Sequence, residues 1–171
     1  MVRLVTERLR LSPIDQADMA DLIQLWADPV FTRFITGRAL NQEEVWLRCL
    51  RDMGQWQAMG YGNWAIRAKD SGEFMGTVGV LDYRRAIEPP MNDPELGWGL
   101  MPRFNGQGFA FEAISTALDW VDRNLGAPRT LCMISPPNQA SIRLANKLGY
   151  RPFTMTSYKD NDVVLYQRPR P

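Results

Sequence analysis

The stretch LGWGLMPRFNGQGFAFEA, residues 96–113, holds four glycines between a strand pattern and the start of an amphipathic helix. Glycine loses more conformational freedom on folding than any other residue. So many glycines are therefore expected where backbone groups must be accessible to another group, without side chains in the way. A strand, a glycine-rich turn and a helix N-terminus direct backbone N–H groups and the positive end of the helix dipole to one point. The segment therefore predicts an α/β chain with an anion site at this helix, although a plain strand-to-helix turn would explain the same residues.

Two common phosphate-binding motifs do not match this turn. A P-loop requires a lysine followed by serine or threonine after its last glycine, and neither follows here. A dinucleotide-binding fingerprint would need a third glycine where Phe111 stands. We expect Gly106 and Gly108 to let the backbone approach a phosphate, with Arg103 as its cationic partner.

The other patterns predict a mixed α/β domain around one sheet, with no repeat, linker or low-complexity segment. Asp15 and Asn41 are predicted N-caps of two helices, and Asn41 with Glu44 matches a capping box. Residues 84–94 contain three prolines and little pattern, so they predict a loop. Period-two or continuous apolar patterns predict strands, and helical spacing predicts two further helices: strands at 7–14, 64–68, 74–83, 94–101, 129–134, 151–158 and 163–168, and helices at 110–121 and 138–148.

Composition excludes several classes of function. The 171 residues carry a formal net charge of +1, which gives no electrostatic support for nucleic-acid binding. The chain has no histidine, so a Ser-His or Cys-His catalytic arrangement is impossible. Cys49 and Cys132 are far apart and are expected to be buried thiols, without a metal site. No apolar run is long enough to span a membrane, and the N-terminus is unlike a signal peptide, so a cytoplasmic protein is expected.

Two motifs together resemble the GNAT superfamily of acetyl-CoA-dependent N-acyltransferases. The first is R-x-x-G-x-G, from Arg103 to Gly108. The second is Asn-x-x-Ser-x-x-Leu-x-x-Lys-x-Gly-aromatic, which runs from Asn138 to Tyr150. The opening TERLRLSPI and the segment ELGWGL are similar to the branch that contains the ribosomal-protein N-terminal acetyltransferases.

This resemblance implies a GNAT fold of the α/β (α+β) class, as a single domain over residues 1–171. Its mixed, mostly antiparallel sheet would have about six to seven strands, splayed in the middle and flanked by about four helices. Pantetheine would lie in the splay between residues 96–101 and 129–134. The residues implied to bind acetyl-CoA are Leu100, Met101, Arg103, Asn105, Gly106, Gln107, Gly108, Phe109, Ala110, Asn138, Ser141 and Lys147.

Acyl transfer to an amine needs a group that removes the ammonium proton. Glu95 is the candidate base, because strand alternation places it on the same face as Gly97 and Gly99, where small neighbours leave room for a substrate. A solvated strand-end glutamate is the alternative. Many superfamily members protonate the thiolate with a tyrosine, but Ala145 stands at that position. In the branch that this chain resembles, the serine of the same helix is the proposed substitute, and the resemblance therefore implies Ser141 as the candidate.

The residues of the second motif also have structural interpretations. The Ser141 hydroxyl could instead bond a carbonyl one turn back, Asn138 could be an N-cap, and Lys147 could be a last-turn charge.

The acceptor side has a weaker signal. By resemblance, residues 31–35 and Tyr158 are candidates, with Phe31, Arg33, Phe34 and Ile35 in the first segment, although such aromatics could be core.

The predicted function is acetyl transfer from acetyl-CoA to a primary amine, of a protein N-terminus or a small molecule, by direct attack in a ternary complex. A catalytically silent coenzyme A-binding module is the alternative, and a nucleotide-binding protein is a third hypothesis. The expected protein is a monomer or homodimer.

Overall fold

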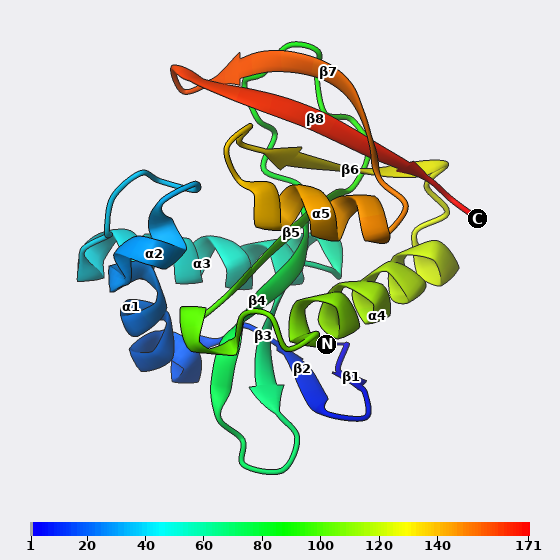
Figure 1. The fold of residues 1–171 in the computed structure, drawn as a ribbon. Coiled ribbons are helices and arrows are strands. Elements are labelled where there is room, and N and C mark those ends of the chain that lie inside the picture. The colour runs from blue at the N-terminus through cyan, green and yellow to red at the C-terminus, as the bar shows by residue number, and fades with distance from the viewer. Residues whose placement is uncertain (1) are drawn as a thin grey trace. The chain divides into compact units, whose positions relative to one another are not determined.

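The computed structural model describes residues 2–171, which form eight strands and five α-helices (Figure 1). The strands pair in the order β1-β2-β3-β4-β5-β6-β8-β7. The predicted mixed, mostly antiparallel α/β architecture is therefore confirmed, with slightly more strands and helices than expected. The additions are the two-residue strand β1 (Leu4–Val5) and the short helix α2 (Pro29–Thr32), whose lengths are too small for a periodic pattern.

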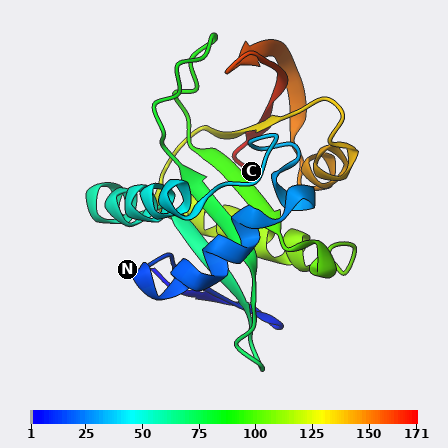
Figure 2. The same cartoon turned by 90° about the vertical axis from the view of Figure 1, so that its left-hand side faces the viewer.

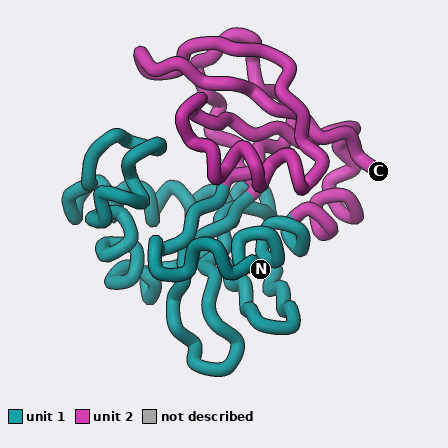
Figure 3. Tube along the Cα trace, in the orientation of Figure 1, with its two compact units in different colours: residues 1–79, 98–117 teal, residues 80–97, 118–171 magenta. Residues whose placement is uncertain are grey.

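The chain divides into two compact units, coloured separately in Figure 3. Unit 1 comprises residues 1–79 and 98–117, and unit 2 comprises residues 80–97 and 118–171. Three elements run from one unit into the other: β4 (Phe74–Leu81), β5 (Glu95–Leu100) and α4 (Phe109–Asn124). The prediction of a single domain over residues 1–171 stays a prediction.

In unit 1, β1, β2 (Leu9–Pro13), β3 (Asn63–Ala68) and β4 pair antiparallel in sequence order. Two longer helices, α1 (Met19–Ala27) and α3 (Gln42–Met59), pack with these strands, and Figure 2 shows α1 crossing the strands of unit 1. Two 3-10 turns, η1 (Gln16–Asp18) and η2 (Pro102–Phe104), complete the unit.

Side-chain caps determine where the helices of unit 1 begin. The Asn41 side chain accepts from the Glu44 N–H at 3.0 Å, and the Glu44 carboxylate accepts from the Asn41 N–H at 2.9 Å. This is the predicted capping box. Asp15 caps η1 by the same arrangement with Asp18. Asp28, which follows the last residue of α1, caps α2, whose first residue is Pro29.

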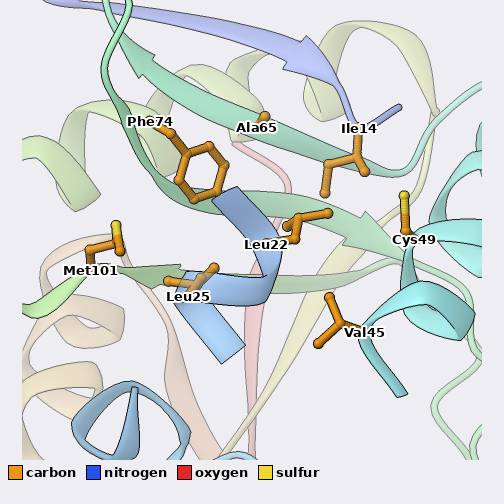
Figure 4. Packing of buried hydrophobic residues seen from close by; sticks show 8 residues of the cluster. All are labelled: Ile14, Leu22, Leu25, Val45, Cys49, Ala65, Phe74 and Met101. Atoms are coloured by element: carbon orange, nitrogen blue, oxygen red, sulfur yellow. The ribbon is translucent and has the colours of Figure 1, made fainter. Parts of the chain in front are cut away.

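The hydrophobic core of unit 1 lies between its helices and its strands. Figure 4 shows side chains from α1, α3, β3 and β4 meeting there, together with one that follows β2 and one that follows β5. Each is at most 7% exposed: Ile14, Leu22, Leu25, Val45, Cys49, Ala65, Phe74 and Met101. Apolar residues at helical spacing in α1 and α3 therefore contribute to this core.

Unit 2 contains β6 (Arg129–Ile134), α5 (Gln139–Lys147), β7 (Arg151–Tyr158) and β8 (Asn161–Pro169). β8 pairs antiparallel with both β6 and β7. β5 and β6 are parallel, with Glu95 opposite Leu131, and the Leu131 N–H donates to the Pro94 carbonyl at 2.9 Å. None of the helices in residues 2–171 is long and apolar enough to cross a membrane.

Candidate active site

The glycine turn, residues 105–108, adopts a backbone that requires glycine at two positions. Gly106 has φ +74° and Gly108 has φ +82°, both in the left-handed region that L side chains rarely adopt. Both glycines are exposed, and a Cβ on Gly106 would have no heavy atom within 4 Å. The turn is therefore determined by backbone conformation and leaves open space above Gly106.

The residue before α4 is Gly108, which has no side chain to act as a cap. The Gly108 carbonyl accepts from the Glu112 N–H at 3.1 Å, so Gly108 stands at the N-cap position. Glycine has no side chain that could bond the free amides, and within residues 2–171 the N–H groups of Gly108, Phe109 and Ala110 find no partner. A phosphate would fit here, because it could accept hydrogen bonds from the free amides and lie at the positive end of the helix dipole. Gly108 has no side chain that would block its approach.

Arg103, the predicted cationic partner, lies on the surface. Its guanidinium is 3.1 Å from the Glu73 carboxylate and 4.7 Å from the centre of the Phe104 ring. Its side chain is 53% exposed. Of its neighbours in the predicted set, Gln107 donates from Nε2 to the Arg103 carbonyl at 2.9 Å, and Asn105 donates its N–H to the Pro102 carbonyl. Arg103 is thus already in an ion pair.

Sequence reasoning missed a second arginine at this turn. Arg8 donates from Nε to Glu112 at 2.6 Å and from Nη1 to the Gln107 carbonyl at 3.1 Å. Burial acts to raise the pKa of Glu112, but hydrogen bonds from the Thr6 hydroxyl and from Arg8 outweigh it, so that pKa is lowered. Arg8 stands 104 residues before Glu112, and no local pattern could have paired them.

At the end of β5, Leu100 and Met101 are buried, each 7% exposed. The Met101 N–H donates to the Met75 carbonyl at 2.8 Å, and its carbonyl accepts from the Phe104 N–H at 2.9 Å. Strand alternation turns the backbone groups of Leu100 away from β4. Of these two residues predicted to bond pantetheine, Leu100 is therefore the better placed.

The space expected beside the β5 glycines is filled, which corrects the sequence interpretation. A Cβ on Gly99 would lie 2.4 Å from the Phe31 ring, and one on Gly97 would lie 2.8 Å from a Leu81 methyl group. These glycines admit neighbouring side chains, not a substrate. Phe31 also stacks edge-on against Trp26, with ring centres 5.1 Å apart, and packs on the core of unit 1.

Glu95 is buried, so it is not the solvated strand-end glutamate that was the alternative. Its side chain is 8% exposed and accepts two hydrogen bonds from Arg85, at 2.7 Å from Nε and 2.9 Å from Nη2. Arg85 is 15% exposed. Although burial acts to lower the pKa of Arg85, the hydrogen bonds and charge of Glu95 raise it well above its usual value. The pair is therefore a fixed, charged arrangement.

Arg85 also joins Glu95 to Tyr158, the residue predicted to contact the acceptor. The guanidinium carbon lies 5.1 Å from the centre of the Tyr158 ring and 5.2 Å from that of Tyr83. All four residues belong to unit 2. Arg85 stands in the patternless loop before β5, so its position came from the tertiary structure and not from a motif.

The second motif forms α5 in unit 2. The Asn138 side chain accepts from the Ser141 N–H at 3.2 Å, so Asn138 is an N-cap. The partly exposed Ser141 hydroxyl makes no hydrogen bond within residues 2–171, which removes its alternative role as a group bonded one turn back. Ala145 is fully buried, and Lys147 is the exposed last residue of the helix.

The remaining acceptor candidates lie in unit 1, at and after α2. The Arg33 guanidinium lies 5.0 Å from the centre of the partly buried Phe34 ring. Ile35 is 50% exposed. Unlike Phe31, these three side chains are not among those that pack on the core cluster around Leu22 and Val45. In the described part of the chain, no three histidine, cysteine or acidic residues gather as metal ligands.

Comparisons with known proteins show the family of the chain. A family model described as an acetyltransferase (GNAT) domain matches residues 8–151. The Bacillus subtilis protein YkkB is 30% identical over 97% of this chain and 95% of its own length. The N-acetyltransferase p20 of Bacillus licheniformis is 28% identical over 88% of this chain and 83% of its own length.

Solved structures show the same fold. A GNAT-family acetyltransferase from Bordetella pertussis has a TM-score of 0.87 at 28% identity, covering 98% of this chain and 99% of its own. RimL, a ribosomal L7/L12 alpha-N-protein acetyltransferase in complex with coenzyme A, has a TM-score of 0.79 at 21% identity, covering 97% and 96%. The family match extends over more than half of the residues, and the chain therefore belongs to the GNAT acetyltransferase family.

Proposed function

We propose that this acetyltransferase moves an acetyl group from acetyl-CoA to a primary amine, of a protein N-terminus or a small molecule, by direct attack. The glycine turn carries the proposal. Two exposed glycines with positive φ precede a helix whose first amides are free, which suits the coenzyme A pyrophosphate. The cofactor-binding roles of Asn138, Ser141 and Lys147 in unit 2 rest on the family resemblance.

The proposed reaction begins with loss of a proton from the acceptor ammonium. Glu95 takes this proton through water, since its two oxygens accept from Arg85 and keep further lone pairs for a water molecule. The neutral amine then attacks the thioester carbonyl, the attacking nitrogen gives up its second proton to water, and the C–S bond breaks as the tetrahedral intermediate collapses. Ser141 stabilises the departing thiolate by donating a hydrogen bond from its hydroxyl, and the thiolate is then protonated by water.

Direct attack is supported by the absence of a suitable nucleophile. The chain has no histidine, and both cysteines are buried. Burial raises the pKa of the Cys132 thiol well above its usual value, and it raises that of Cys49 as well. A thiol with a raised pKa is a poor source of thiolate at neutral pH, so neither cysteine suits an acyl-enzyme intermediate.

The acceptor side of the proposal centres on Tyr158 in unit 2, and the role of Phe34 in unit 1 rests on the family resemblance. Tyr158 is partly exposed and contacts the guanidinium that holds Glu95, so it links acceptor binding to the proposed base. Phe31 has a weaker case than Phe34, because its ring already contacts Gly99 and Trp26.

Initial-rate kinetics test this function. We expect thiol release from acetyl-CoA in the presence of an amine, with intersecting double-reciprocal lines for the two substrates. Parallel lines would indicate a covalent intermediate and contradict direct attack. Binding of acetyl-CoA without release over a broad panel of primary amines and N-terminal peptides would instead indicate a silent coenzyme A-binding module.

Glu95→Gln tests the base. We expect turnover to fall by roughly 10²- to 10⁴-fold, the range for a lost general base, with a smaller loss at high pH, where more of the amine is already neutral. Thermal denaturation of the same variant reports whether the loss of the ion pair has unfolded the enzyme. A folded variant with an unchanged rate near neutral pH would remove Glu95 from the mechanism.

A further inference from the structure

Arg8 belongs to the turn between β1 and β2, yet its side chain reaches the glycine turn before α4. Its Nη1 donates to the Gln107 carbonyl at 3.1 Å, and its guanidinium carbon lies 4.3 Å from the centre of the Phe109 ring. Gln107 and Phe109 flank Gly108. All of these residues belong to unit 1, so the arrangement is internal to one compact body.

Glu112 fixes the direction of this arginine. Its Oε2 accepts from Arg8 Nε at 2.6 Å, and its Oε1 accepts from the Arg8 backbone N–H at 3.0 Å and the Thr6 hydroxyl at 2.5 Å. The Nε bond to Glu112 and the Nη1 bond to the Gln107 carbonyl leave the guanidinium little freedom. Arg8 is still 43% exposed along its side chain, so a ligand can reach it.

One guanidinium nitrogen remains available. Arg8 Nη2 makes no hydrogen bond within residues 2–171, whereas Nε and Nη1 each do. This nitrogen lies 3.4 Å from the point where a Cβ on Gly108 would stand. It therefore faces the side of Gly108 that the missing side chain leaves open.

We propose that Arg8 is the arginine that contacts the coenzyme A pyrophosphate, and that Glu112 is its positioning residue. The inference rests on the proposed function and assigns a residue outside both motifs. A guanidinium donates to phosphate oxygens in fixed geometry, beside the amides of the helix N-terminus. Arg103 is less suited, because its guanidinium pairs with Glu73, whereas the guanidinium of Arg8 also bonds the glycine turn itself at the Gln107 carbonyl.

The charge balance of the turn supports this role. Glu112 lies in the first turn of α4, where its carboxylate would repel a bound pyrophosphate. Arg8 neutralises that carboxylate, so removing Arg8 both deletes a phosphate contact and exposes a repelling charge. Removing both side-chain charges should therefore do less harm than removing Arg8 alone.

The test compares acetyl-CoA with acetyl-pantetheine, a donor that has the same thioester and no pyrophosphate. We expect Arg8→Ala to raise the dissociation constant of acetyl-CoA by about 10- to 100-fold, the range for a lost charge-assisted hydrogen bond. The kcat/KM with acetyl-pantetheine should not change. Arg10→Ala, which removes an equal charge from an exposed side chain two residues away, is the matched control and should leave both donors unaffected.

Glu112→Gln separates charge from shape, because the amide oxygen can still accept from Thr6 and Arg8. We expect the double variant Arg8→Ala, Glu112→Gln to recover part of the lost acetyl-CoA affinity. Unchanged acetyl-CoA affinity in Arg8→Ala, or an equal loss with both donors, would overturn the role of Arg8. If the unaltered protein itself fails to bind acetyl-CoA, the proposed function is wrong.

Discussion

Replacing Arg85 by methionine isolates the buried ion pair on which the proposed base depends. Methionine retains an unbranched apolar side chain between Tyr83 and Tyr158 but deletes the charge and both hydrogen bonds to Glu95. The carboxylate, 8% exposed, would then have no cation beside it. Breaking a buried pair in this way costs about 3–5 kcal/mol, because the remaining charge is not compensated.

Urea unfolding at neutral pH of the unaltered protein, the two single variants and Arg85→Met, Glu95→Gln measures this cost. We expect the double variant to lose less free energy of unfolding than the sum of the singles, by about 1–3 kcal/mol, since it leaves no buried charge unpaired. Arg38→Met is the control, because Arg38 also forms two bonds with one carboxylate, that of Glu44, but is 63% exposed. Surface pairs contribute little, so its unfolding midpoint should barely move.

A cost of less than about 1 kcal/mol for Arg85→Met would refute the reasoning. So would additive effects of the two substitutions in the double variant. Either result would mean that water reaches Glu95 freely, and the residue would then return to the solvated interpretation that its buried position now excludes.

Three further outcomes are expected. Gly106→Val should destabilise the protein and weaken acetyl-CoA binding in calorimetry, whereas the control Gly126→Val, at φ +63° and also without neighbours within 4 Å, should only destabilise the protein. Equal affinities of the two variants for acetyl-CoA would mean that the phosphates bind elsewhere. Ser141→Ala should slow single-turnover acetyl transfer with little change in acetyl-CoA affinity, and a normal transfer step in this variant would remove the serine from catalysis. Asn138→Ala should instead weaken acetyl-CoA binding by about 1–2 kcal/mol. Folding lowers the pKa of Glu112, so the ionised carboxylate stabilises the protein at pH values above the pKa of the unfolded chain, and this stabilisation is lost as the pH falls through the pKa of the folded protein. Glu112→Gln should therefore reduce the loss of stability on acidification, and an unaltered dependence of the free energy of unfolding on pH would contradict the lowered pKa.

Local signals in the sequence were sufficient for most of the elements. The capping box at Asn41 forms as predicted, because both of its partners lie within one helical turn. The strand, glycine turn and helix at residues 95–124 also follow from short-range pattern and backbone chemistry, with glycine at φ +74° and +82°. The apolar run at 129–134 became β6, since continuous burial needs no distant information.

The chemistry around these elements was decided by tertiary structure. Arg85 lies in a loop without periodicity, and only folding brings it onto Glu95, so that the candidate base forms a buried ion pair that the sequence did not indicate. Phe31 fills the space at Gly99 that the sequence left for a substrate. Arg8 reaches the glycine turn from the far end of the chain. Caps and turns depend on residues that are neighbours along the chain. Ion pairs and packed rings depend on which distant segments come into contact, and local patterns in a single sequence do not specify those contacts.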